Sequence, residues 1–376
     1  MKPVEAAVMA SIFTFLHFVG TAYGTAVNIS NTEPRFDTNN LEMDIHDGNI
    51  VQWHPGGLYY FYGMGYQNCT QKNGLIPPYQ CPGIYEKFGQ CGFRTDHAVR
   101  VYTSKDLASW TLVSENALPV AARPYGIYFR PKVIYNTASA QYLLWINILR
   151  NASTPLEAYP DASYLVAAAP TPEGPFAVVT EKVSMSQTGG GDFDVIVDPN
   201  NRTRAYIAYD AWENGHRIMV QELSSNFSDV LGDGAKTDFL TPKGNEAPIF
   251  FERQGWYYIL YGPTCCFCKE GSGANVLVSS APLGPWVSMN VDLNPKLPNS
   301  MDRTIAGQNS FNVEVTLASG AVEMLFVSDR WSSAPDHLKS HDLQYWQPLL
   351  FNDSAKPPTI AVFEWRDWFV LQMPPE

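Results

Sequence analysis

The 376-residue chain has few charged residues and little sign of helix. Only 16% of its residues are charged. Beyond the first 24 residues, we find no convincing stretch with the i, i+3, i+4 and i+7 apolar spacing of an amphipathic helix. The chain also lacks a cluster of basic residues, and its formal net charge of −12 would repel a phosphate backbone. The composition therefore argues against a helical bundle and against nucleic acid as a partner.

Two common hydrolase signatures are also missing. There is no His-Glu-x-x-His pair to hold a catalytic zinc and no Gly-x-Ser-x-Gly elbow to present a serine nucleophile. The triple glycine at 189–191 lacks the strand–loop–helix context of a phosphate-binding loop. We therefore expect neither a zinc hydrolase nor a serine esterase, and we read the glycines as a tight turn.

Long hydrophobic runs are confined to the N-terminus. Lys2 precedes an apolar stretch from Ala6 to Val19, and the small residues Ala22 and Gly24 follow it. This pattern predicts a signal peptide over residues 1–24 and a secreted protein, with residues 25–376 forming one domain. The stretch is shorter than the roughly 20 residues that a membrane helix needs, so we expect no membrane span.

Sequons and cysteines agree with export. Six cysteines form two clusters, and we predict disulfides rather than a zinc site, with at least one bridge joining the clusters if all six pair. The clusters are Cys69, Cys81 and Cys91, then Cys265, Cys266 and Cys268. Asn-x-Ser/Thr glycosylation sequons begin at Asn28, Asn68, Asn151, Asn201, Asn226 and Asn352.

Strand signals are dense. Five aromatic and β-branched runs follow short turns, at residues 57–62, 141–146, 204–209, 255–261 and 322–327. Before each run lies another short strand, at residues 49–53, 131–135, 194–198, 247–251 and 311–315. Five such units recurring at roughly 50 to 80 residues predict an all-β, five-bladed β-propeller. A β-sandwich is the alternative, but it does not explain the recurring unit. We expect residues 359–371 to supply closing strand material.

The innermost strand of each propeller blade begins near the central axis, so residues just before these strands should converge. They are Asp47, Arg130, Asp192 (or its close competitor Asp194), Glu246 and Gln308. Carboxylates at three of five positions suit a glycosidase, which needs one carboxylic acid to protonate the leaving oxygen and one carboxylate to activate water or attack carbon. A third carboxylate nearby can raise the pKa of the acid.

Several motifs at these positions resemble glycoside hydrolase family 43, and particularly its exo-β-1,3-galactanase-like branch. The matching segments, in chain order, are 45–50 with 58–63, 130–136 with 142–145, 192–200 with 205–207, 246–251 with 256–260, and finally 307–310 and 328–331. The resemblance implies Glu246 as general acid, Asp47 at the general-base position and Asp192 as the residue that modulates the pKa of the acid. Gln308 is a second candidate base by analogy with the branch.

The family inverts configuration, so its acid and base stand roughly 6.5–9.5 Å apart to leave room for water. The resemblance implies a monomeric, exo-acting enzyme on a polysaccharide or oligosaccharide, with β-1,3-galactan or arabinogalactan as first guess and arabinan or xylan as second. We expect no catalytic cofactor and no metal at the site, although such a propeller channel can hold a structural Ca²⁺. Further candidates for substrate binding are His46, Arg130, Asp194, Trp145 and Arg330.

Two departures leave alternatives open. Phe129 stands where the galactanase-like branch has a glutamate, which keeps open a catalytically inactive, carbohydrate-binding propeller. The same branch has no aspartate at position 47, so Asp47 is closer to the wider family. A retaining enzyme of the invertase type ranks last, because the chain has His-Asp-Gly-Asn and Glu-Ala-Pro in place of its Asn-Asp-Pro-Asn and Glu-Cys.

Overall fold

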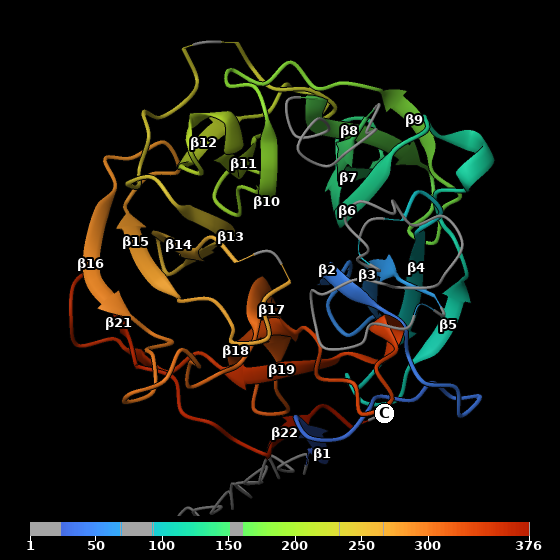
Figure 1. Cartoon of the computed structure of the whole chain (residues 1–376), viewed down its shortest axis with the longest axis vertical. Helices are drawn as coiled ribbons and strands as arrows, with labels where there is room; N and C mark the ends of the chain where they lie inside the picture. The colour runs from blue at the N-terminus through green and yellow to red at the C-terminus, as the bar shows by residue number, and fades with distance from the viewer. Residues whose placement is uncertain are drawn as a thin grey trace, which may run out of the picture.

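Five antiparallel sheets stand around a central axis in the computed structural model, and the predicted five-bladed propeller is confirmed (Figure 1). The structure describes residues 24–67, 69, 92, 94–150, 161–232, 234–265 and 267–375. The predicted signal peptide up to residue 23, the sequons at Asn68 and Asn151, and Cys81, Cys91 and Cys266 lie outside these residues. Across the described residues, no helix is long and apolar enough to cross a membrane.

Each blade is a meander that runs outward from the axis, because strands that follow one another in the chain pair as neighbours. Blade 1 contains β2 (His46–Gln52), β3 (Tyr59–Gly65), β4 (Ala98–Ser104) and β5 (Thr111–Ser114). Blade 2 contains β6 (Ile127–Asn136), β7 (Gln141–Leu149), β8 (Ala162–Ala169) and β9 (Ala177–Thr180). Blade 3 contains β10 (Gly190–Val197), β11 (Ala205–Ala211) and β12 (Ile218–Glu222). Blade 4 contains β13 (Asn245–Arg253), β14 (Trp256–Pro263), β15 (Asn275–Ser279) and β16 (Val287–Asp292). Blade 5 contains β17 (Gln308–Thr316), β18 (Val322–Arg330) and β19 (Leu343–Pro348).

The chain ends pair outside the blades. Strand β22 (Trp368–Met373) pairs antiparallel with β1 (Thr25–Ser30), and β20 (Phe351–Asn352) pairs with β21 (Thr359–Ile360). The expected closing material is therefore two short strands, β21 and β22, and β22 pairs with the N-terminal strand. Short 3₁₀ turns lie at η2 (Val120–Ala122), η4 (Trp212–Asn214) and η5 (Lys339–His341).

Apolar side chains fill the interfaces between neighbouring blades, as two-sided burial of aromatic and β-branched strands requires. One cluster joins blades 1 and 2, another joins blades 2 and 3, and the remaining clusters join blades 3 to 5 and return to blade 1. The inner strands also contact one another around the ring, from β2 to β6, β10, β13, β17 and back to β2. This closure brings the starts of five distant strands to one place.

Every inner strand carries a β-bulge near its start. The register shifts lie between His46 and Asn49, Phe129 and Lys132, Gly190 and Phe193, Glu246 and Ile249, and Asn309 and Phe311. At three bulges a residue other than glycine has left-handed backbone: φ is 56° at Asp47, 51° at Arg130 and 51° at Ala247. The site residues were expected just before the inner strands. They lie within the first residues of these strands, where a bulge interrupts the regular alternation of side chains.

The described residues include three disulfide-bonded cysteines. Cys265 and Cys268 form a disulfide within the second cluster, with their Cα atoms 5.3 Å apart. Cys69 is also disulfide-bonded. The predicted bridge between the two clusters stays a prediction, since three of the six cysteines lie outside the described residues.

Candidate active site

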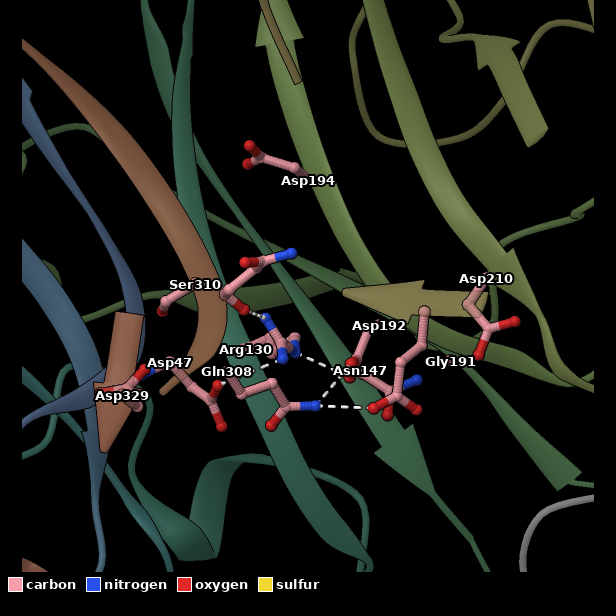
Figure 2. A network of polar contacts seen from close by, with 12 residues as sticks. Asp47, Arg130, Asn147, Gly191, Asp192, Asp194, Asp210, Gln308, Ser310 and Asp329 are labelled. Atoms are coloured by element: carbon pink, nitrogen blue, oxygen red, sulfur yellow. Dashed lines mark hydrogen bonds and ion pairs between the residues drawn. The ribbon is translucent and has the colours of Figure 1, made fainter. Parts of the chain in front are cut away.

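Arg130 lies at the centre of a network of charged side chains at the axis (Figure 2). Its Nε donates a 2.7 Å hydrogen bond to Asp192 Oδ1, and its Nη1 donates to the carbonyl of Asn309 at 3.1 Å. Its Nη2 lies 3.6 Å from Asp47 Oδ1. Arg130 is 2% exposed. One buried guanidinium therefore links carboxylates from blades 1 and 3 and holds them apart.

Gln308 links the next pair of acids. Its Nε2 donates to Glu246 Oε1 at 2.7 Å and lies 3.4 Å from Asp192 Oδ2. Its Oε1 accepts a 2.8 Å hydrogen bond from the indole N–H of Trp331. Because an indole N–H can only donate, this contact fixes which end of the amide faces the carboxyl groups.

Glu246 is buried at the start of β13, where 7% of it is exposed. Its Oε1 accepts hydrogen bonds from the backbone N–H of Cys265 at 2.6 Å and from Gln308. Burial raises the pKa of Glu246 well above its usual range, and the negative charges of Asp192 and Asp210 raise it further. Because both donors point at Oε1, the carboxylic proton belongs on Oε2.

Asp47 is also buried, on the opposite side of Arg130 from Asp192 (Figure 2). The Tyr66 hydroxyl donates to its Oδ2 at 3.1 Å, and its own N–H donates to Asp329 Oδ2 at 3.1 Å. Its Oδ1 accepts no hydrogen bond from any residue that the structure describes. Burial raises the pKa of Asp47, Arg130 opposes this, and the negative charges of Asp329 and Asp192 add to it.

Five of the predicted site residues thus meet: Asp47, Arg130, Asp192, Glu246 and Gln308 form one chain of contacts.

The structure does not bring Asp194 and His46 into this network. Asp194 lies apart from the other acids (Figure 2); its Oδ2 accepts from the N–H of Phe250 at 2.9 Å, and Lys132 lies 3.6 Å from its Oδ1. His46 is fully buried, with Nδ1 3.2 Å from Asp329 Oδ1. These contacts tie blades together around the axis, and substrate binding by the two residues stays a prediction.

Trp145 and Arg330 also lie outside the network and contact other parts of the chain. The Trp145 ring is fully buried between blades 2 and 3, and its N–H donates to the carbonyl of Phe227 at 2.9 Å. No face of the ring is left for a sugar. Arg330 donates to the carbonyl of Asn31 at 2.8 Å and stacks 4.9 Å from the Trp365 ring centroid. Its guanidinium therefore ties blade 5 to the segments that follow β1 and precede β22.

Four neighbours of the network were not among the predicted site residues. Tyr66 and Trp331 orient Asp47 and Gln308, while Asp210 and His216 lie beside Glu246. Asp210 directly follows a predicted strand, so its position on β11 was the one available signal. The other three residues lie at strand ends or in turns, where the sequence pattern does not predict the direction of a side chain.

Asp210, His216 and Glu246 offer ligand atoms that all lie within 4.8 Å of one another. This group could hold a metal ion by geometry. That such a channel can hold a structural Ca²⁺ stays a prediction.

A ring with carboxyl groups gathered at its axis has the carboxyl pair that glycoside hydrolysis needs. The chain belongs to glycosyl hydrolases family 43, whose family model matches residues 86–314, more than half of its length. It is therefore a glycosidase, an enzyme class that hydrolyses O-glycosyl bonds. No curated protein sequence matches the chain.

Solved structures share the fold. An exo-β-1,3-galactanase from Clostridium thermocellum has a TM-score of 0.71 and 21% identity over 93% of this chain and 69% of that one. An exo-β-1,3-galactanase from Phanerochaete chrysosporium with bound galactose has a TM-score of 0.65 and 23% identity over 89% and 67%. A family 43 β-1,3-galactosidase has a TM-score of 0.69 and 19% identity over 92% of this chain. The chain spans only 64% of the length of that galactosidase.

Replacing Arg130 tests the architecture of the network. We expect Arg130→Met to lower the free energy of unfolding by about 3–5 kcal/mol, because it leaves the buried Asp47 carboxylate and the partly buried Asp192 carboxylate without their cation. Urea unfolding followed by tryptophan fluorescence measures this loss. Arg253→Met is the matched control, since Arg253 pairs with Asp353 at the surface and should change stability little. Equal losses in the two variants would show that Arg130 does not carry the network.

Proposed function

We propose that this protein is a secreted, inverting, exo-acting glycosidase of β-1,3-galactan or arabinogalactan, with Glu246 as general acid and Asp47 as general base. The observation that carries the proposal is the buried Glu246 carboxyl, whose pKa is raised by burial and by two neighbouring acids. A raised pKa keeps the carboxyl group protonated to a higher pH, as the role of general acid requires.

The acid step follows from the hydrogen bonds of Glu246. Its Oε1 is held by Cys265 and Gln308, so the carboxyl group cannot rotate freely. Oε2 would give its proton to the glycosidic oxygen as the bond to the anomeric carbon breaks. The resulting carboxylate would be stabilised by the same two donors, which strengthen as charge develops on Glu246.

Asp47 is the better candidate base. Its Oδ1 has lone pairs that no described residue uses, and Tyr66 and Arg130 orient the carboxylate. It would take a proton from water as that water attacks the anomeric carbon. Gln308 is less suited, because its oxygen already accepts the Trp331 N–H and its nitrogen faces Glu246.

The network also supports inversion. Arg130 stands between Asp47 and Asp192, and Gln308 stands between Asp192 and Glu246. Along this path three side chains, those of Arg130, Asp192 and Gln308, lie between the proposed base and the proposed acid, in keeping with a mechanism that needs room for a water molecule. A retaining enzyme would need the two carboxyl groups closer, about 5–5.5 Å apart.

The sugar is proposed by analogy with the similar structures, which are galactanases and a galactosidase. Arabinan and xylan are the second choice. Secretion is supported by the apolar N-terminal pattern and by four sequon asparagines that the structure places in exposed positions: Asn28, Asn201, Asn226 and Asn352.

A substrate panel read by proton NMR tests the proposal. The protein is incubated with β-1,3-galactan, arabinogalactan, arabinan, xylan and the matching aryl glycosides, and the first-formed sugar is observed before it mutarotates. We expect release of single galactose units with inverted anomeric configuration. Binding without turnover of any substrate would refute an enzyme and favour a carbohydrate-binding propeller, and a retained anomer would refute inversion.

A further inference from the structure

The small sheet formed by β1 and β22 lies outside the five blades (Figure 1). An antiparallel sheet with one face in water usually carries polar side chains on that face. The outer face of this sheet instead carries two large apolar residues: Trp368 is 59% exposed and Val370 is 43% exposed. The inner face is buried, and its side chains belong to the cluster that joins blades 5 and 1; they are Val27, Ile29, Phe369, Leu371 and Met373.

Asn28 lies on the same outer face and begins a glycosylation sequon that ends at Ser30. In the register of the two strands Asn28 is directly opposite Val370, and Trp368, which is opposite Ser30, is its diagonal neighbour. Directly opposed Cβ atoms lie about 4.5–5.5 Å apart, and diagonal neighbours lie about 7–8 Å apart, within reach of long side chains. A sugar attached to the Asn28 amide therefore emerges beside the indole ring of Trp368.

The Asn28 side chain differs from those of the other sequon asparagines that the structure describes. Asn201, Asn226 and Asn352 each accept a 3.2 Å hydrogen bond at Oδ1 from the backbone N–H two residues further along, in local turns. The Asn28 side chain makes no hydrogen bond to any described residue. Because side chains of a strand stand roughly perpendicular to the sheet, its amide is directed over the face that carries Trp368.

We propose that an N-linked glycan on Asn28 covers the outer face of the β1–β22 sheet, with its first N-acetylglucosamine packed on Trp368 and Val370. A pyranose ring has an apolar face of C–H groups that suits the flat, apolar face of an indole. The glycan shields an exposed apolar patch that would otherwise favour association with other molecules. This inference rests on the proposed secretion and not on the proposed glycosidase activity.

Oxidation of tryptophan by hydroxyl radicals, measured by peptide mass spectrometry, tests the contact in protein secreted from eukaryotic cells. We expect Trp368 to be oxidised about twofold faster or more in Asn28→Gln than in wild type, because the sugar covers one of the two faces of the ring. Enzymatic trimming of the wild-type glycan to its first N-acetylglucosamine should leave the rate unchanged. Asn201→Gln is the matched control, because it removes a sequon in an exposed turn of blade 3 and should not affect Trp368.

Thermal unfolding gives a second measurement of the same contact. Asn28→Gln should lower Tm by about 1–2 °C, and Asn201→Gln should not. In a Trp368→Ser background, the Asn28→Gln change should lower Tm less, because the partner of the sugar is already gone and the two substitutions are not additive. Equal losses with and without Trp368 would contradict the packing of the sugar on this ring.

The mass spectra also report whether Asn28 carries a glycan. A protein with glycans at other sequons and none at Asn28 would overturn this inference alone, whereas a protein with no glycan at any sequon would refute secretion as well. Equal oxidation of Trp368 with and without the glycan would also overturn the inference. If Asn28 is unmodified and Trp368 is protected only at high protein concentration, a second copy of the chain covers the face instead.

Discussion

Glu246→Gln should reduce kcat on the polysaccharide by about 10²- to 10⁴-fold, the usual contribution of a general acid. The glutamine side chain has the same shape, and its oxygen can accept the hydrogen bonds from Cys265 and Gln308 that Oε1 accepts. It has no acidic proton to give, so the leaving oxygen must depart as an unprotonated alkoxide. Substrate affinity should change little, because the contacts of the side chain are preserved.

The dependence on the leaving group separates an acid from a binding residue. Aryl glycosides with an acidic phenol as leaving group need little protonation, so Glu246→Gln should lose much less activity on them than on galactan. Glu252→Gln, at the other end of the same strand, is the control and should behave as wild type. If Glu246→Gln lost the same activity on both kinds of substrate, the result would contradict a general acid. If the variant kept full activity on galactan, Glu246 would have no catalytic role.

Asp47→Ala should lose activity to a similar degree, about 10²- to 10⁴-fold, because no carboxylate remains to take the proton of the attacking water. Azide is an anion and attacks without losing a proton. Added azide should therefore restore turnover in Asp47→Ala and yield a glycosyl azide of inverted configuration, measured by NMR. Gln308→Ala is the informative comparison: rescue of that variant, with none for Asp47→Ala, would transfer the role of base to Gln308.

The two proposed roles also predict the limbs of the pH profile. Asp47 must be ionised to act as a base, and its pKa is raised by burial, so kcat/KM should fall as pH drops through that raised value. Glu246 must be protonated, and its pKa is raised by burial and by Asp192 and Asp210, so kcat/KM should fall as pH rises through it. Residual activity in Asp47→Ala should lose the acid limb, and that in Glu246→Gln the alkaline limb. Profiles that keep both limbs in both variants would contradict the assignment.

Much of this protein could be predicted from sequence because strand order and strand pattern are local properties. Aromatic and β-branched runs of the length of a strand, each preceded by a turn and a second strand, recur five times and specify five hairpins. A propeller places the starts of its inner strands at the axis, so five residues far apart in sequence could be expected to meet. Asp47, Arg130, Asp192, Glu246 and Gln308 do meet.

The direction in which a side chain points within a blade could not be predicted in the same way. Trp145 was a reasonable sugar platform by type, but its position in β7 points it into the interface with blade 3. Asp192 and Asp194 share a strand face by simple alternation, yet the bulge after Gly190 separates them, so that only Asp192 contacts Arg130. Bulges depend on how neighbouring inner strands crowd the axis, which no local pattern records.

The sequence by itself determined the fold class, the family and which strand starts carry acids, because these depend on residue type and spacing along the chain. Only the tertiary structure decided that Trp331 orients Gln308, that Tyr66 holds Asp47 and that Asp210 and His216 stand beside Glu246. These contacts join side chains on different strands and loops, and their distances are set by blade packing. The protonation of Glu246 follows from the same cause, since burial and neighbouring charge exist only once the ring has closed.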